Sequence, residues 1–386
     1  MEEKLWEACS NGNVEEVQKL LQNAQININW QDSKYLRTPF YRACSNGNIG
    51  IVKLLLNDER IDINKANSEG CTPFYVACEN GHFDIVKLSL NDKRIDFNKA
   101  ENGGATPFFI ACEFGHIDIV KLLLNNNRVD DINKAFNTGA TPFLIACENG
   151  HIEIVKLLLN DNRIDINKAT NDSSTPFYIA CENGNIELVK LLLNDNRVDI
   201  SKVQSEGATP FYVVCQNGHL EIVKLLLNDN RVDISRVDVN KCLKTNSTNN
   251  GETPFYIACS KGHIDIVKIL LSDHRVDINK AENDGATPFY IACQAGNLEV
   301  VKYMLESGRE IDFNKKWNNK TPLDISKERS KSTQKFSWET EEVFQKAKRN
   351  CPKIVEFIES FQRNPVDTRE KLRKELGLLG KSFTLF

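Results

Sequence analysis

The sequence is built on a repeat of about 34 residues, and this repeat constrains the fold more than any other feature of the chain. The dipeptide Thr-Pro occurs nine times, at steps of 34 or 35 residues with one step of 44. A related stretch without Thr-Pro, LWEACSNGNVEEVQKLLQNAQININ, precedes the first of them, so the chain holds about ten repeats. A period of this length is typical of stacked repeats that share one continuous core. The nine threonines are Thr38, Thr72, Thr106, Thr141, Thr175, Thr209, Thr253, Thr287 and Thr321.

Each repeat is predicted to form two short helices joined by a turn, as residues 141–174 illustrate. The Thr141 hydroxyl can cap the first helix, and Pro142 suits the first helical position because its missing N–H costs no hydrogen bond there. Gly150 can end this helix in the left-handed conformation. The second helix, at about 151–159, has an apolar face wider than one neighbour can cover. It is therefore expected to pack against its partner helix and both adjacent repeats, before a hairpin-like loop leads to the next Thr-Pro.

The repeated text TPF(Y/F/L)(I/V)AC, followed by G-(H/N) and (I/L)VKLLL, resembles the ankyrin repeat. The resemblance extends from about Leu5 to Ser326 and recurs in register, and the text is similar to ankyrin arrays of unicellular eukaryotes. It implies an all-α solenoid of helix–turn–helix repeats, with hairpin-like loops between them and a helical C-terminal cap. It also implies a protein that binds other proteins along the concave face of the solenoid.

Two features depart from the ankyrin pattern. The period is 34 rather than 33, and we expect the extra residue to cause a bulge in the segment NDNRID. The histidine that usually follows Thr-Pro-Leu is also replaced, so we expect aromatic packing in place of the threonine–histidine hydrogen bond. The replacing residues are Tyr41, Tyr75, Phe109, Leu144, Tyr178, Tyr212, Tyr256 and Tyr290.

The array is expected to occupy residues 1–323, with an N-terminal capping repeat at 1–37 and regular repeats from 38. About ten extra residues lengthen the connection at 235–252, which is expected to be an exposed loop that carries Cys242. Residues 324–386 are expected to hold capping helices and a basic amphipathic tail, with a net charge of +4 against −8 for the rest of the chain.

Within this C-terminal part we predict the last repeat's second helix at Pro352–Phe361, and a further helix capped by Asp367 or Thr368. The basic tail could dock on the last repeat, on a membrane surface or on another chain. We favour docking on the last repeat.

The stretch CENGH at 147–151 places a thiol, a carboxylate and an imidazole within five residues, which raises the question of a catalytic or metal site. The cysteine recurs at one position in nine repeats, which favours a role in helix packing. The histidine position holds Asn48, Asn185 or Asn297 in other repeats, and asparagine cannot act as a general base. The chain has no P-loop, H-E-x-x-H or C-x-x-C motif. We expect neither an enzyme nor a bound metal or cofactor; catalysis by pairs such as Cys147 and His151 is the rival hypothesis.

Composition narrows the class of partner. The net charge is −4 and the pI about 6, so no nucleic-acid partner is expected. Membrane attachment is not favoured, because no apolar run approaches the roughly 18 residues that a membrane span needs. The start of the chain, MEEKLWEACSNGN, has no signal-peptide pattern, which favours a cytoplasmic location without excluding the nucleus.

A binding site is expected where otherwise similar repeats differ. Phe114 replaces the Asn, Lys or Ala of other repeats at the end of a first helix, and Phe136 lies at a mostly polar loop position. This pair could anchor a partner in the concavity, or the two rings could pack on each other. Trp317 is a third candidate, which could instead cover the end of the core. The loop tips are slightly acidic, which favours a basic or polar partner segment; the remaining candidates are Glu101, Asn137, Asp172, Glu206 and Asp284.

The sequence thus favours a non-catalytic scaffold for protein–protein interactions, with the identity of the partner left open. A regulatory or inhibitory subunit that occludes a partner enzyme is one alternative. An adaptor held at a membrane by its basic C-terminal tail is another.

Overall fold

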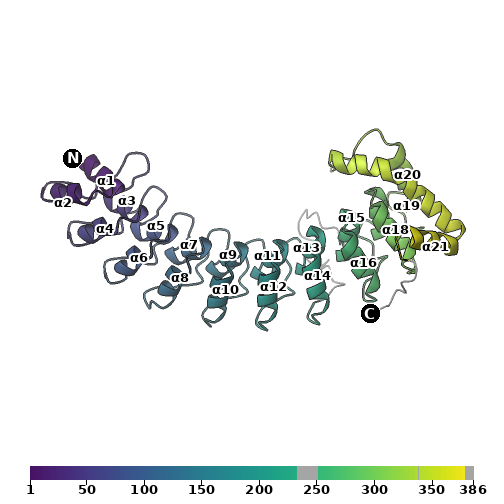
Figure 1. Ribbon diagram of the computed structural model, residues 1–386, viewed down its shortest axis with the longest axis horizontal. Coiled ribbons are helices and arrows are strands. Elements are labelled where there is room, and N and C mark those ends of the chain that lie inside the picture. Colours follow the sequence, from purple (N-terminus) through teal and green to yellow (C-terminus); the bar gives the residue numbers. More distant parts are fainter. Residues whose placement is uncertain (233–250, 338, 379–386) are drawn as a thin grey trace. The chain divides into compact units, whose positions relative to one another are not determined.

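The computed structural model describes residues 1–232, 251–337 and 339–378 (Figure 1). These residues form 21 α-helices and no strand, with one isolated β-bridge between Trp317 and Lys320. The chain divides into two compact parts, Met1–Ile179 and Ala180–Phe386, which we call the N-terminal half and the C-terminal half and describe one at a time. The 235–252 loop lies mostly outside the described residues, and so does its Cys242.

The N-terminal half consists of helix pairs stacked in two layers (Figure 1). The first helix of each pair packs against the first helices of the adjacent repeats, and the second helices form the other layer. The helices are α1 (Glu2–Asn11), α2 (Val14–Leu21), α3 (Pro39–Ser45), α4 (Ile49–Leu56), α5 (Pro73–Glu79), α6 (Phe83–Ser89), α7 (Pro107–Glu113), α8 (Ile117–Leu124), α9 (Pro142–Glu148) and α10 (Ile152–Leu159).

The C-terminal half repeats this arrangement and then ends in longer helices. The α11 helix (Pro176–Glu182) spans the division between the halves. The others are α12 (Ile186–Leu193), α13 (Pro210–Asn217), α14 (Leu220–Leu227), α15 (Pro254–Lys261), α16 (Ile264–Ser272), α17 (Pro288–Gln294), α18 (Leu298–Glu306), α19 (Pro322–Lys331), α20 (Glu341–Arg363) and α21 (Pro365–Glu375).

The predicted helix starts are confirmed. In all nine Thr-Pro repeats the threonine Oγ1 accepts a hydrogen bond from the backbone N–H three residues later, at 3.0 to 3.2 Å. The turn after the first helix contains a glycine in the left-handed region, as at Gly81 with φ of 75°. A Cβ at Gly81 would lie 2.6 Å from the His116 ring of the next repeat, so both conformation and space require glycine.

The core lies between the two helix layers of each half. A phenylalanine follows the first eight Thr-Pro dipeptides and is at most 2% exposed, and each such ring contributes about 1.5–3 kcal/mol of burial free energy. The residue that follows it, tyrosine in most repeats, is also buried. Aromatic packing therefore occupies the place of the usual histidine, as the sequence predicted.

The NDNRID segment, in which a bulge was predicted, forms a turn whose arginine caps the second helix of the preceding repeat. In it Arg163 pairs with Asp161 at 2.6 Å, and the same guanidinium donates to the Leu124 carbonyl at the end of α8. Arg94 does the same for the Leu56 carbonyl of α4. Because the last carbonyls of a helix have no partner within it, each arginine caps the second helix of the repeat before its own.

The last repeat differs from the prediction. A single helix, α20, runs from Glu341 to Arg363 with Pro352 inside it, although a helix was predicted only from Pro352. Thr340 caps its start, accepting from the Val343 N–H. The early turns of α20 pack closely on the turn between α17 and α18, where a Cβ at Gly296 would lie 2.4 Å from the Ala347 Cα. The predicted cap of the final helix is also wrong, because Asn364 rather than Asp367 or Thr368 precedes α21.

The α21 helix docks on the last repeat. Leu372 is fully buried, Arg373 pairs with Glu306 of α18 at 3.3 Å, and Glu375 lies 3.4 Å from Lys302. Arg369 donates to the Leu305 carbonyl. Two basic residues of this helix, Arg369 and Arg373, therefore contact α18 of the array, as expected for the favoured of the three alternatives.

Candidate partner-binding surface

The cysteine and histidine of CENGH lie in different surroundings. Cys147 is 1% exposed between stacked first helices, and burial raises its pKa above the usual range, which makes the thiol a poor nucleophile. The His151 Nε2 instead lies 2.9 Å from the Glu113 carbonyl of the preceding repeat. The Asn297 side chain makes the corresponding contact by donating to the Ser260 carbonyl at 2.8 Å, which explains why asparagine can replace histidine at this position. The other cysteines of the described residues are also free and buried.

Phe136 fills a structural position in its loop. Its ring stacks on Phe109 of α7, with centroids 5.9 Å apart, and covers Gly103, where a Cβ would lie 2.4 Å from the ring. In most other repeats the same two positions hold a tyrosine and a polar residue, as in the hydrogen bond of 3.3 Å that the Asn67 side chain donates to the Tyr41 hydroxyl. Phe109 and Phe136 thus replace a polar pair by an apolar one.

Trp317 occupies the position of Phe136 in the last loop. Its ring lies edge-on to Tyr290, 5.5 Å between centroids, and it is half-buried. Both rings therefore contribute to the packing of loop on helix, and the sequence missed this because each partner lies 27 residues earlier in the chain.

Phe114, in contrast, exposes its ring. It is 52% exposed at the C-terminal end of α7, and its nearest ring is His116 at 6.4 Å rather than Phe136. The alternative in which the two phenylalanines pack on each other is therefore wrong. The asparagines at this position elsewhere donate to the preceding repeat, as Asn80 does to the Ser45 carbonyl and Asn149 to the Glu113 carbonyl. Phenylalanine cannot make this bond, so the substitution gives up a hydrogen bond between repeats and adds an exposed aromatic ring.

The first helix that ends before Phe114 and those of the two adjacent repeats each end in a glutamate: Glu113, Glu79 and Glu148. Burial and the neighbouring Glu69 and Glu113 raise the pKa of Glu79, and burial and Glu148 raise the pKa of Glu113. Each carboxylate therefore makes its neighbours harder to ionise. A cationic partner would relieve this repulsion.

The acidic loop residues named from the sequence are engaged within their own loops. The Glu101 carboxylate accepts from the N–H groups of Gly103 and Ala105 at 2.7 and 2.9 Å. Asp172 accepts from the hydroxyl of Thr170 and from the hydroxyl of Ser174. These carboxylates shape the loops, so a partner would compete with bonds that already exist.

Of the remaining loop candidates, Asn137 lies beside the loop of Glu101. Its backbone N–H donates to the Gly103 carbonyl, and its carbonyl accepts from the Asn171 side chain. Glu206 and Asp284 are exposed on separate loops of the C-terminal half. The Glu206 N–H is bonded within its own loop, to the Gln204 side chain.

One exposed feature was missed by the sequence analysis. The first loop presents Tyr35 and Leu36, which are 38% and 45% exposed. Comparing the residues two positions before each Thr-Pro would have revealed this feature, because most repeats have glycine there and the first loop has Leu36.

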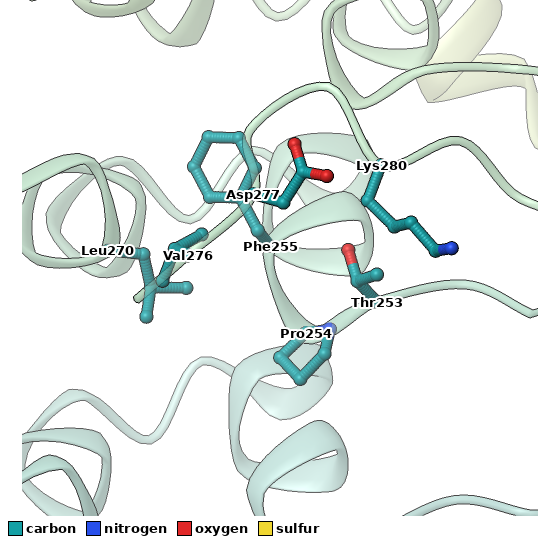
Figure 2. A pocket seen from close by; sticks show the side chains of 7 residues that line it. All are labelled: Thr253, Pro254, Phe255, Leu270, Val276, Asp277 and Lys280. Atoms are coloured by element: carbon teal, nitrogen blue, oxygen red, sulfur yellow. The ribbon is translucent and has the colours of Figure 1, made fainter. Parts of the chain in front are cut away.

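A cavity of about 220 Å³ lies beside the Thr-Pro of α15 (Figure 2). A matching cavity one repeat earlier is bounded in part by Ile200 and Ser201 and holds about 30 Å³. The counterparts of these two residues, Ile234 and Ser235, lie outside the described residues. The larger cavity is therefore not treated as a binding site. Its lining residues are Thr253, Pro254, Phe255, Leu270, Val276, Asp277 and Lys280.

Comparison with known proteins agrees with the geometry. A family model described as ankyrin repeats (3 copies) matches five overlapping segments, at residues 5–101, 87–170, 164–240, 233–316 and 274–329. No curated protein sequence matches the chain. Among the described residues, no helix combines the length and the apolar character needed to cross a membrane.

Proposed function

Because the chain belongs to the ankyrin repeat family, whose members generally mediate protein–protein interactions, we propose that it is a non-catalytic scaffold that binds a basic segment of another protein around Phe114. The observation that carries this proposal is the exchange at the end of α7. An asparagine that elsewhere ties two repeats together is replaced there by a ring that is 52% exposed. A change that weakens the array and adds an aromatic anchor is more readily explained by binding than by stability.

The surrounding charge supports a basic partner. Glu113 helps to raise the pKa of Glu79, Glu148 helps to raise the pKa of Glu113, and a Lys or Arg from a partner would be attracted to these carboxylates. The partner segment would then place an apolar side chain on Phe114 and its cations on the carboxylates. Such charge pairing makes the affinity depend on salt concentration.

Selection from a phage-displayed library of random peptides tests the proposal. We expect the wild-type chain to enrich peptides with Lys or Arg around an apolar residue. Phe114→Asn, which restores the residue of neighbouring repeats, should bind the selected peptides at least about tenfold more weakly. Its melting temperature should be unchanged or higher. The proposal would be overturned if no basic peptides were enriched, or if the enriched basic peptides bound Phe114→Asn as well as the wild type.

Membrane attachment through the C-terminal tail is less well supported. Arg369 and Arg373 contact the array through the Leu305 carbonyl and Glu306. A lipid surface would have to compete with these contacts. An inhibitor of a partner enzyme would use the same Phe114 surface, and loss of activity in that enzyme would identify it.

A further inference from the structure

The first loop carries the one pair of consecutive large apolar side chains that is exposed in the described part of the chain. Tyr35 and Leu36 form this pair, which lies between α2 and α3. The other exposed large apolar residues stand alone in the sequence: Met1, Val14, Phe114 and Val366. Adjacent exposed apolar side chains of this size usually indicate contact with another molecule.

Leu36 also adopts a backbone conformation that disfavours leucine. Its φ is 54°, in the left-handed region, which costs about 1–2 kcal/mol for an L-residue with a Cβ. Most later loops place glycine at this position, as at Gly70 with φ of 85° and Gly139 with φ of 87°. A bulky side chain retained at such a cost, and left exposed, indicates a role outside the fold.

The loop holds these side chains in a fixed arrangement. The Asp32 carboxylate accepts from the backbone N–H groups of Lys34, Tyr35 and Arg37 at 2.8 to 3.1 Å. The Tyr35 carbonyl accepts from the Ser68 N–H of the next loop. A partner would therefore bind a preformed surface and would lose little entropy in ordering it.

Positive charge gathers around the two apolar residues. Lys34 and Arg37 lie over the Tyr35 ring at 4.7 and 4.4 Å, and Arg42 lies 5.0 Å from the Trp6 ring. The Arg42 Nε is buried without a hydrogen-bond partner. Asp32 is the carboxylate that pairs with Arg37. This basic surface contrasts with the carboxylates around Phe114 in the same half.

We propose that Lys34, Tyr35, Leu36 and Arg37, the first-loop tip, form a docking surface for an acidic segment of a partner protein. An apolar side chain of the partner packs against Tyr35 and Leu36, and its carboxylates face Lys34 and Arg37. The exposed leucine favours a protein over a nucleic acid, because a phosphate backbone offers no apolar group to cover it. This surface is separate from Phe114 and opposite in charge, so the inference does not depend on the proposed function.

The same peptide selection, carried out on the full chain, tests this surface with a different variant. Tyr35→Glu combined with Leu36→Gly gives the first loop the residues of the next loop, Glu69 and Gly70, at these positions. The exchange relieves the strain at Leu36, so the melting temperature should not fall. We expect the wild type and Phe114→Asn to enrich acidic peptides with an apolar centre. The double variant should bind them at least about tenfold more weakly.

Several outcomes would overturn the inference. One is that no acidic peptides are enriched, and another is that the enriched acidic peptides bind the double variant as well as the wild type. A single-stranded RNA of mixed sequence that bound in place of the peptides, with the same dependence on Leu36, would make the surface a nucleic-acid site. Self-association that is seen in sedimentation and lost in the double variant would make the occupant a second copy of the chain.

Discussion

In the first loop of the array the hydrogen-bonded backbones of Asp32 and Arg37 are five positions apart, whereas in the last loop those of Trp317 and Lys320 are three positions apart. In the corresponding loops described between them the separation is four, as from Asn67 to Cys71. The longer loop pushes two apolar side chains into solvent. The shorter one folds back on Tyr290 and leads into helices that cover the last repeat. The first loop thus exposes apolar side chains, whereas the last loop leads into further helices that pack on the array.

Charged groups are exposed in the first loop and buried in the C-terminal cap. Around the first-loop tip the cations lie on exposed aromatic rings. In the C-terminal cap, Arg329 is 1% exposed, pairs with Glu339, donates to the Gln294 carbonyl and lies over the Phe344 ring. The comparison teaches that charged groups of a repeat array can lie on an exposed aromatic ring in one repeat and form a buried pair that fixes a cap in another.

Removing one member of the buried pair should have the largest effect. Glu339→Ala leaves the Arg329 charge buried and unpaired, so the free energy of unfolding of the C-terminal half should fall by about 3–5 kcal/mol. Urea denaturation measures it. The double variant Arg329→Met with Glu339→Leu should recover much of the loss. A loss below about 1 kcal/mol in Glu339→Ala would show that the cap does not rely on this pair.

Truncating an apolar side chain that is buried in the C-terminal cap should have the next largest effect. Leu372→Ala removes a fully buried side chain from the contact of α21, at a cost of about 2–4 kcal/mol. Hydrogen exchange of the α21 amides should accelerate accordingly. Val366→Ala on the same helix is the control, because Val366 is 71% exposed and its loss should change the exchange little.

In two loops of the N-terminal half, adding a side chain at a glycine and replacing a leucine by glycine should change the melting temperature in opposite directions. Gly70→Ala places a Cβ 2.6 Å from the Asn102 Oδ1 at a left-handed φ. It should therefore reduce the free energy of unfolding by about 1–2 kcal/mol and lower the melting temperature. Leu36→Gly should leave it unchanged or raise it. If Leu36→Gly lowers the melting temperature as much as Gly70→Ala does, the leucine stabilises the fold and the first loop is not strained.

The smallest effect concerns pH and a loop of the C-terminal half. Burial, together with Glu252 and Asp284, raises the pKa of Glu282 to about 7. A glutamate in an unfolded chain titrates near 4.3, so the folded state binds this proton more tightly. The free energy of unfolding should therefore fall as the pH rises through the interval between those two values. Glu282→Gln should flatten that fall; an unchanged pH profile in chemical denaturation would contradict the assignment.

Much of the fold could be predicted from the sequence, because the determining signals are local. The Thr-Pro caps and the apolar faces repeat every 34 residues, and each needs only its own neighbours to be recognised. The start of α20 was missed because residues 341–351 are strongly charged. Their buried residues Phe344, Ala347 and Cys351 are nevertheless spaced at three and four, the helical period that would have revealed the helix.

The candidate surface was predicted less well, because exposure depends on contacts between distant positions. Phe114 and Phe136 look alike in the sequence, yet only Phe136 stacks on another phenylalanine and lies over a glycine that makes room for it. Leu36 was overlooked since nothing in its own sequence marks a left-handed conformation. Only comparison with the glycines of later loops does so.

Because of the arginine turns, each repeat is completed by the repeat that is synthesised after it. Arg94 closes α4 from 38 residues beyond Leu56, and Arg163 closes α8 from 39 residues beyond Leu124. During synthesis each repeat therefore leaves the ribosome with an unfinished helix end, which only the following repeat can complete. A chain truncated between repeats would lack this closure at its last helix, whereas the loss of repeats from the front would leave the remaining helix ends closed.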